Sequence, residues 1–211
     1  MTAVRFTDVI TEESELREIF GWPSDRALNK ETNSLDHHCR AIISKSPFIL
    51  LGTSNSAGHC DVSPKGDYPG FVRVLDDKTV AIPDLPGNNR LDTLKNMLDN
   101  PQVGLIFLIP AMNETLRING KVRLVRDSGL LESMAYQGKS PKLAIVVDVE
   151  EVFIHCPKAF MRSRLWSDEN RIDRNDLGSM AEILRDHAGL ADCDVEELQL
   201  ELGQKWVKEL H

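Results

Sequence analysis

Hydrophobic and polar positions follow different patterns in different parts of the chain. Near the N-terminus, apolar residues recur at helical spacing, which predicts helices over 11–20 and 33–45, the second ending before Pro47. From residue 48 onward, short runs rich in Val, Ile, Leu and Phe alternate with turn residues, as β-strands do. We predict strands over 48–54, 59–63, 71–75, 79–83, 103–109, 115–125 and 144–155, with hairpin turns at 55–58 and 76–77.

Helical spacing returns at a few places after the strands begin. Leu91, Leu94 and Leu98 are spaced so that one helix can place all three against the sheet. A parallel sheet needs a crossover helix after nearly every strand, and the pattern predicts too few helices among the strands for that. A parallel sheet is therefore excluded. The pattern predicts a mainly β chain with flanking α-helices (α+β), in which an antiparallel sheet forms a closed or half-closed barrel. The further helices are expected over 89–98, 127–137, 175–187 and 195–210.

A single core is the simplest organisation for 211 residues, because domains hold roughly 100 to 200 residues each. No internal repeat of fixed period and no low-complexity linker divides the chain. We therefore predict one domain over 1–211, with N-terminal helices at 1–46, the barrel core at 47–168 and C-terminal helices at 169–211.

Charge and composition narrow the classes of partner. A net charge of −8 argues against a general affinity for nucleic acid or anionic lipid. The longest strongly apolar stretch, 103–109, is far shorter than the roughly 20 residues that cross a bilayer, and the first residues do not resemble a signal peptide. The four cysteines form no C-x-x-C pair, so neither a zinc site nor a disulfide framework is indicated. We expect a cytoplasmic protein without a nucleic-acid or membrane partner.

The most informative segment is IPDLPGNNRL at 82–91, where a strand ends, a Gly-containing turn follows and a helix begins. A helix start offers unpaired N–H groups and partial positive charge, and the planar guanidinium of Arg90 suits phosphate oxygens. Asn88 and Asn89 add amide donors. The segment predicts a phosphate-binding turn. The alternative is that Asn88 or Asn89 merely caps the helix while Arg90 is solvated.

A second candidate segment is DVSPKG at 61–66. Pro64 lacks an N–H and is expected to stop ladder pairing, which leaves the chain after Val62 free to present amides to a planar ligand. Taken alone, the segment is better explained as a strand exit with an exposed Lys65.

The predicted strand over 115–125 alternates apolar and polar residues. Arg117, Asn119, Lys121 and Arg123 therefore share one face, which is cationic. Two alternatives stay open: the face is an ordinary solvated surface, or a bulge or turn at Asn119 and Gly120 changes the facing.

The stretch CPKAFMRSRLW at 156–166 packs basic, aromatic and thiol groups directly after a strand. Arg and Trp are typical interface anchors and can also contact a charged, planar cofactor. Cys156 is expected to be a buried, inert thiol. His37 and His38 are not expected to bind metal, because adjacent residues point to different sides of a helix. G-x-S-x-G, G-x-x-x-x-G-K and G-x-G-x-x-G motifs are absent at strand-to-helix positions, so hydrolase, P-loop and Rossmann chemistry lack support.

Taken in order, these segments resemble the pyridoxamine 5'-phosphate oxidase-related, FMN-binding split-barrel proteins over residues 41–168. The resemblance rests on the strand, turn and helix described above, followed by NPQVGLIF at 100–107 and LRINGKVRLV at 116–125. CPKAFMRSRLW is similar to a subgroup of this family described only as FMN-dependent proteins.

The resemblance implies a dimeric split barrel that binds FMN at sites between the two subunits. Asn89 and Arg90 would help to hold the phosphate, and Arg117 would lie near the ring system. The residues implied at the cofactor are Val62, Ser63, Pro64, Lys65, Ile82, Pro83, Asp84, Asn88, Asn89, Arg90 and Arg117, with Lys158, Arg164 and Trp166 approaching from the neighbouring subunit.

Two departures from the vitamin-producing oxidase of the family remove support for its substrate. That enzyme carries Tyr-Thr-Asn and an Arg-Lys pair where this chain has residues 82–84 and 89–90, and its substrate-binding segment with Trp and Arg-x-His is not found here. The implied function is an FMN-dependent oxidoreductase acting on a small molecule, with no candidate for a general acid or base. The alternative is a non-catalytic flavin or haem carrier or sensor, with His155 or His59 as a haem ligand.

Overall fold

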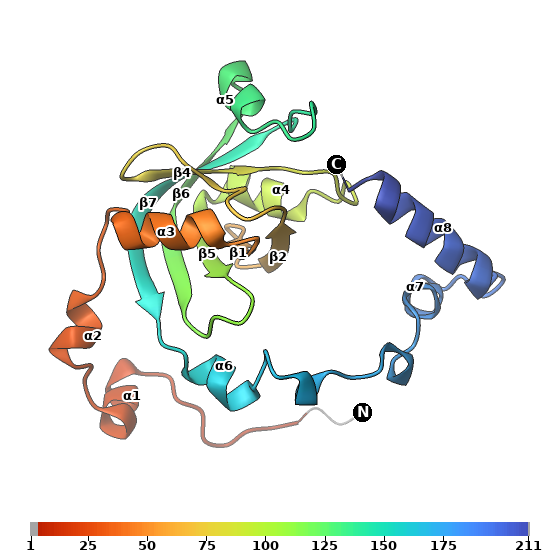
Figure 1. Ribbon diagram of the computed structural model, residues 1–211. Helices are drawn as coiled ribbons and strands as arrows, with labels where there is room; N and C mark the ends of the chain where they lie inside the picture. The colour runs from red at the N-terminus through yellow and green to blue at the C-terminus, as the bar shows by residue number, and fades with distance from the viewer. Residues whose placement is uncertain (1–3, 211) are drawn as a thin grey trace.

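The computed structural model describes residues 4–210, so residues 1–3 of the predicted N-terminal segment lie outside it. Its centre is one seven-stranded antiparallel sheet with the order β2-β1-β5-β6-β7-β4-β3, and helices flank this sheet (Figure 1). The predicted fold class, mainly β with flanking helices, is confirmed. The strands are β1 (Phe48–Ser54), β2 (Cys60–Gly66), β3 (Arg73–Val74), β4 (Thr79–Pro83), β5 (Gln102–Leu108), β6 (Thr115–Val125) and β7 (Ala144–His155).

β2 is longer than predicted. Pro64 was expected to end its pairing at Ser63, yet the ladder with β1 continues to Gly66. The physical reason is the position of β2 at the edge of the sheet, where it pairs with β1 alone. A proline is tolerated in an edge strand because its missing N–H can face away from the ladder.

The main core lies on one face of the central strands, and Ala81, Met134, Ala144 and Val146 form a second, smaller buried cluster. Alternate residues of β1 and β5, such as Ile49, Leu51 and Phe107, are fully buried, as the period of two along a strand requires. α3 covers part of this core with Cys39 and Ile43. The alternating sequence therefore sets which face of β1 and β5 is inside.

The two ends of the sheet approach each other. β2 and β4 are not neighbours in the strand order, yet Lys65 Nζ at the end of β2 lies 2.7 Å from Asp84 Oδ1, directly after β4. The sheet is therefore curled, and side chains rather than a ladder join β2 to the end of β4, as the prediction of a half-closed barrel requires.

The helices follow the predicted order with shifted ends. α1 begins at Glu13 behind a capping box formed by Glu12 and Glu15. α2 and α6, of five and six residues, were not predicted. The helices are α1 (Glu13–Phe20), α2 (Asp25–Asn29), α3 (His37–Lys45), α4 (Asp92–Asp99), α5 (Ser128–Ser133), α6 (Lys158–Ser163), α7 (Met180–Ala188) and α8 (Val195–Lys208). None of the helices described has the length and apolar character needed to cross a membrane.

α4 presents a different face to the sheet from the one predicted. Thr93 and Met97 are its buried residues, whereas Leu91 and Leu98 are 51% and 76% exposed. Only Leu94 of the three predicted contacts packs against the core. The helix begins at Asp92, after Leu91, and this start orients the i, i+4 pair 93 and 97 inward.

The cysteines differ sharply in their surroundings. Cys39 is buried, and this burial, together with the neighbouring Asp36, raises the pKa of its thiol to about 11. Cys156 is exposed, which contradicts the expectation of a buried thiol, because β7 ends at His155 and leaves Cys156 beyond the sheet.

These environments predict selective alkylation. At pH 8, iodoacetamide should modify Cys156 and the exposed Cys60 at least about tenfold faster than Cys39, since the thiolate is the reactive form. Peptide mass spectrometry over a time course measures the three rates. Equal labelling of Cys39 in folded protein would contradict its buried environment.

Candidate functional site

The turn between β4 and α4 has an unusual backbone. Asn89 and Leu91 adopt left-handed conformations, with φ of 58° and 61°. Asn tolerates this region, whereas Leu seldom does and costs on the order of 1 kcal/mol there. The side-chain oxygen of Asn88 accepts a hydrogen bond from the backbone N–H of Arg90 at 3.0 Å. Asn88 and Asn89 therefore shape the turn, and neither occupies the cap position of α4, which Leu91 holds.

Arg90 projects from this turn into solvent. Its side chain is 76% exposed, and its Nε donates to Asp92 Oδ2 at 2.7 Å. The Asp92 carboxylate raises the pKa of Arg90, which stays charged at any physiological pH. An exposed guanidinium beside the first residues of a helix can turn toward an anion, although it must then share its donors with Asp92.

Two side-chain contacts bring β2 against this turn. Thr93 Oγ1 in the first turn of α4 donates to Asp61 Oδ2 at 2.5 Å. At the other end of β2, Lys65 pairs with Asp84, and both side chains are about one-fifth exposed. The structure thus groups three predicted segments, 62–65, 82–84 and 88–90. Asp61 belongs to the candidate segment 61–66, but neither it nor Thr93 was predicted as a site residue, because a hydroxyl and a carboxylate 32 positions apart give no local signal.

The predicted site residues within these segments are not equally accessible to a ligand. Lys65 and Ser63 lie half-buried on one side of β2, while Val62 and Pro64 are exposed on the other. Ile82 is fully buried in the core and Pro83 is buried beside it, so their side chains are occupied by packing. From 82–83, only the backbone is left to meet a ligand.

Arg117 lies on the same sheet but away from the phosphate turn. The strand registers place it in one cross-strand row with Pro64, three strands apart, which corresponds to roughly 14 Å. Its Nε donates to Asn119 Oδ1 at 3.2 Å, and its guanidinium lies over the Phe153 ring at 5.4 Å. Arg117 is therefore grouped with β7 rather than with Arg90 and Lys65.

The predicted cationic face of β6 is present but largely neutralised. Residues 117, 119, 121 and 123 do share the less buried face. A bulge occurs at Asn119 and Gly120, yet its extra residue belongs to β7, so the facing along β6 is kept. Lys121 pairs with Glu150 at 3.4 Å and Arg123 with Asp148 at 2.7 Å. The carboxylates of β7 thus leave little excess positive charge.

The segment after β7 lies at another part of the molecule. Trp166 Nε1 donates to the carbonyl of Met112 at 2.9 Å, in the loop between β5 and β6. Arg164 pairs with Glu169 at 2.8 Å. α6, which begins at Lys158, continues into a chain that leaves the barrel (Figure 1). Within this chain, Arg164 contacts Glu169 and Trp166 contacts the loop between β5 and β6, away from the phosphate turn. Their approach from a neighbouring subunit stays a prediction.

His37 and His38 lie closer together than expected. Their ring centroids are 3.8 Å apart, and their ligand atoms lie within 4.8 Å of one another and of an Asp36 oxygen. The premise that adjacent helical residues diverge is wrong here, because both lie in the first turn of α3, where the rings can fold over one another. All three residues are exposed, and Asp36 caps α3 by accepting from the Cys39 N–H, so the group is also what a surface helix start provides.

His155, one of the two proposed haem ligands, is half-buried at the end of β7. Burial lowers the pKa of its ring, and the positive charges of Arg117 and Lys30 lower it further. The imidazole is therefore neutral near pH 7. A neutral ring is the form that can ligate a metal, so the protonation state of His155 is compatible with the haem alternative.

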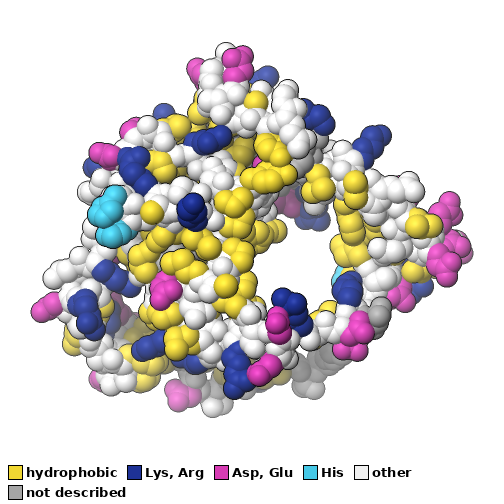
Figure 2. Space-filling view, viewed as in Figure 1, with side chains coloured by type: hydrophobic (Ala, Val, Ile, Leu, Met, Phe, Trp, Pro, Cys, Tyr) yellow, Lys and Arg dark blue, Asp and Glu magenta, His cyan; other side chains and the backbone are white. Residues whose placement is uncertain are grey.

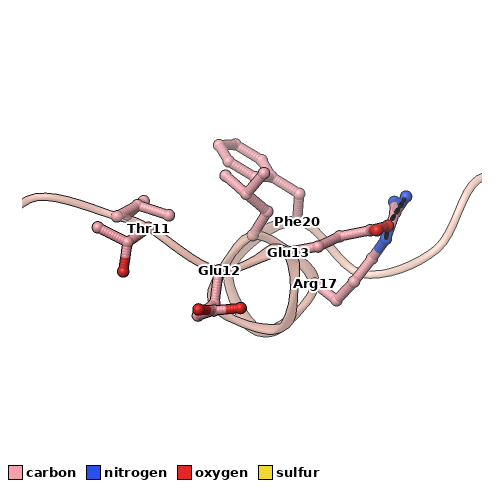
Figure 3. Close-up of a pocket in the computed structure, with 7 residues that line it drawn as sticks. Thr11, Glu12, Glu13, Arg17 and Phe20 are labelled. Atoms are coloured by element: carbon pink, nitrogen blue, oxygen red, sulfur yellow. Dashed lines mark hydrogen bonds and ion pairs between the residues drawn. The ribbon is translucent and has the colours of Figure 1, made fainter.

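A pocket beside α1 offers no comparable group of side chains for holding a cofactor. It is lined by residues of one short segment, and Figure 3 shows Thr11, Glu12 and Phe20 around it, with Glu13 paired to Arg17 at 2.9 Å. None of the predicted site residues lines it. The convergent groups at the start of α4 are the better candidate.

The Lys65–Asp84 pair gives a prediction about stability. Asp84→Asn should lower the free energy of unfolding by about 1–2 kcal/mol, because it leaves a partly buried ammonium with a weaker partner; the exposure of the pair keeps this below the cost of a fully buried one. A double-mutant cycle with Lys65→Met, followed by urea unfolding, measures the coupling. Additive single and double variants would show that the pair contributes nothing.

A family model described as pyridoxamine 5'-phosphate oxidase matches residues 35–156. No curated protein sequence matches the chain significantly.

Several solved structures are similar in fold. HupZ from Group A Streptococcus has 19% identity and a TM-score of 0.46, over 56% of this chain and 92% of its own. General Stress Protein 26 from Bacillus anthracis has 11% identity and a TM-score of 0.44, over 55% and 88%. A pyridoxamine 5'-phosphate oxidase-related, FMN binding protein from Nostoc punctiforme has 15% identity and a TM-score of 0.37, over 52% and 73%.

Proposed function

Because this chain belongs to the pyridoxamine 5'-phosphate oxidase family, we propose that it binds FMN and acts as an FMN-dependent oxidoreductase on a small molecule. The observation that carries the proposal is the convergence of β2, the end of β4 and the start of α4, joined by the Asp61–Thr93 and Lys65–Asp84 contacts. The substrate is unassigned, because residues 82–84 and 89–90 depart from those of the vitamin-producing oxidase.

The residues at this junction suit the chemistry of FMN. Its phosphate needs cations and N–H donors, which Arg90 and the unpaired amides at the start of the eight-residue α4 supply. Its flat ring needs a backbone edge with free donors and acceptors. β2 has such an edge, because it pairs with β1 on one side only.

In the proposed complex, the protein binds and orients the cofactor. Arg90 and the α4 amides hold the phosphate, and Asp84 keeps the ammonium of Lys65 at the junction. When bound, FMN supplies hydride or electron transfer, chemistry that no side chain of this chain provides. No residue is assigned as a general acid or base.

We also propose that the working form is a homodimer with FMN sites between the subunits. In that arrangement Lys158, Arg164 and Trp166 reach the site of the neighbouring copy, which agrees with their separation from the phosphate turn within one chain. Four free thiols fit a cytoplasmic location.

The redox role is tested by mixing FMN-loaded protein with NADH, NADPH or dithionite under anaerobic conditions and following absorbance near 450 nm. Bleaching by a nicotinamide, followed by recovery with an acceptor over many cycles, is expected for an oxidoreductase. Bleaching by dithionite alone would contradict this role for the donors tried and favour the carrier or sensor alternative.

A further inference from the structure

The chain exposes far more surface than a compact monomer of its size. Its accessible surface is 14951 Å², whereas a compact protein of 23.7 kDa is expected to expose roughly 9,800 Å². The excess is therefore about 5,000 Å² per chain. Obligate homodimers bury about 2,000–5,000 Å² in total, so half of this excess on each copy would supply a large, stable interface.

Much of the excess lies in the C-terminal segment. After α6 the chain passes through two short 3-10 turns, Asp168–Asn170 and Arg174–Asp176, into the α7–α8 hairpin. Figure 1 shows this segment running away from the barrel and returning only at its end, where Leu210 lines one pocket together with residues 66–69. Figure 2 shows the open hollow that results, with hydrophobic side chains on both the barrel side and the α8 side.

The hairpin is too small to be stable by itself. α7 and α8 have 9 and 14 residues, lengths at which isolated helices are marginal in water. They pack on each other around Ala181, whose N–H donates to Gln199 Oε1 at 3.2 Å. Leu200 and Val207, seven residues apart and so on one face of α8, remain 67% and 75% exposed. This apolar face of α8 therefore needs another protein surface to cover it.

The distribution of charge along the chain indicates which surface covers this apolar face of α8. The segment 176–210 carries nine Asp and Glu against three Lys and Arg, so most of the chain's net charge of −8 lies there. Two such hairpins repel each other. The remainder of the chain is nearly balanced in charge, and its hollow side is apolar. A hairpin therefore fits against the barrel side of another molecule rather than against a second hairpin.

We propose that the α7–α8 hairpin, residues 180–208, docks against the barrel of a second copy of this chain. We call this hairpin the clasp. Under twofold symmetry, each copy fills the hollow of the other, so both apolar linings are covered by one self-complementary interface. The clasp extends the dimer of the proposed function with residues that lie outside the segment matched by the family, 35–156. It makes the two subunits interlock instead of meeting only through their barrels.

The test compares full-length wild-type protein with Leu200→Glu/Val207→Glu by sedimentation equilibrium. Both positions are exposed in the single chain, so the subunit should keep its fold, which circular dichroism checks. We expect a dimeric wild type and a dissociation constant raised roughly 100-fold or more in the variant, because two carboxylates enter an apolar interface. The control is Lys205→Gln/Lys208→Gln, which changes the charge of α8 by the same amount without placing a charge on that face; it should bind within about threefold of wild type.

Three results would overturn the clasp. One is a variant dimer as tight as wild type, which would leave the barrel dimer standing. Another is a monomeric wild type, which would also remove the proposed homodimer, while FMN binding is judged separately from the flavin spectrum. The third comes from hydrogen exchange: α7 and α8 amides should be protected in the dimer and exchange rapidly on dilution to monomer, and equal protection in both states contradicts the clasp.

Discussion

Replacement of Arg90 by alanine should weaken FMN binding by about 30- to 100-fold, the equivalent of about 2–3 kcal/mol for charged hydrogen bonds to a phosphate. Arg90 is exposed beside the start of α4, and its present partner, Asp92, is a neighbour in sequence. Loss of the side chain therefore removes donors for the phosphate while costing the apoprotein little. Fluorescence titration of apoprotein with FMN measures the change.

The control for this prediction is Arg171→Ala. Arg171 is likewise exposed and paired with a nearby aspartate, Asp168, but it follows the barrel and has no part in the α4 start. Its removal should leave the FMN dissociation constant within about twofold. If both variants bind FMN like wild type, Arg90 does not hold the phosphate.

Replacement of Gly120 by alanine should destabilise the folded protein by about 3 kcal/mol, which lowers the melting temperature by roughly 6–12 °C. A Cβ at this position would lie 2.1 Å from the carbonyl oxygen of Asp148 and 3.1 Å from a methyl of Val147. Both contacts come from β7 at the bulge. The Asp148 contact is with backbone, which cannot swing aside, and the Val147 methyl belongs to a fully buried side chain. Calorimetry or urea unfolding of the apoprotein gives the loss.

Gly129→Ala is the matched control for this substitution. Gly129 lies in α5, and an added Cβ would meet its nearest atom at an ordinary 3.5 Å. Alanine favours a helix over glycine by about 0.5–1 kcal/mol, so this variant should be as stable as wild type or slightly more stable. Equal stability of Gly120→Ala and Gly129→Ala would show that the bulge is not tightly packed.

The strands were largely predictable because short apolar runs between turn residues mark them, and in β1 and β6 the alternation also records the inside and outside of the sheet. β1, β4, β6 and β7 begin and end where the pattern places them. β2 does not, since the tolerance of Pro64 depends on which strand lies at the edge, and edge position is set by the pairing of the whole sheet. The inward face of α4 was missed for a similar reason: its start at Asp92 follows from the left-handed turn before it.

The candidate site was predictable as segments and not as contacts. The turn at 88–90 could be found because Asn and Gly have local effects on the backbone and the guanidinium of Arg90 suits phosphate oxygens. The segment 61–66 was found as a candidate, although the expected end of pairing at Pro64 was wrong. Their connection through Thr93 and Asp61, and the pairing of Lys65 with Asp84, depend on how far the sheet curls. The net positive charge of β6 was overestimated because the partners of Lys121 and Arg123, Glu150 and Asp148, lie 29 and 25 residues further along the chain, in β7.

The most direct test of the account is the absorbance spectrum of the freshly purified protein, followed by release and chromatographic identification of any cofactor and by titration of the apoprotein with FMN. We predict flavin bands near 375 and 450 nm, FMN as the released species, and one FMN per chain at saturation. A protein that is colourless and fails to bind added FMN, or one that carries haem instead, would contradict the assignment of the α4 junction as an FMN site.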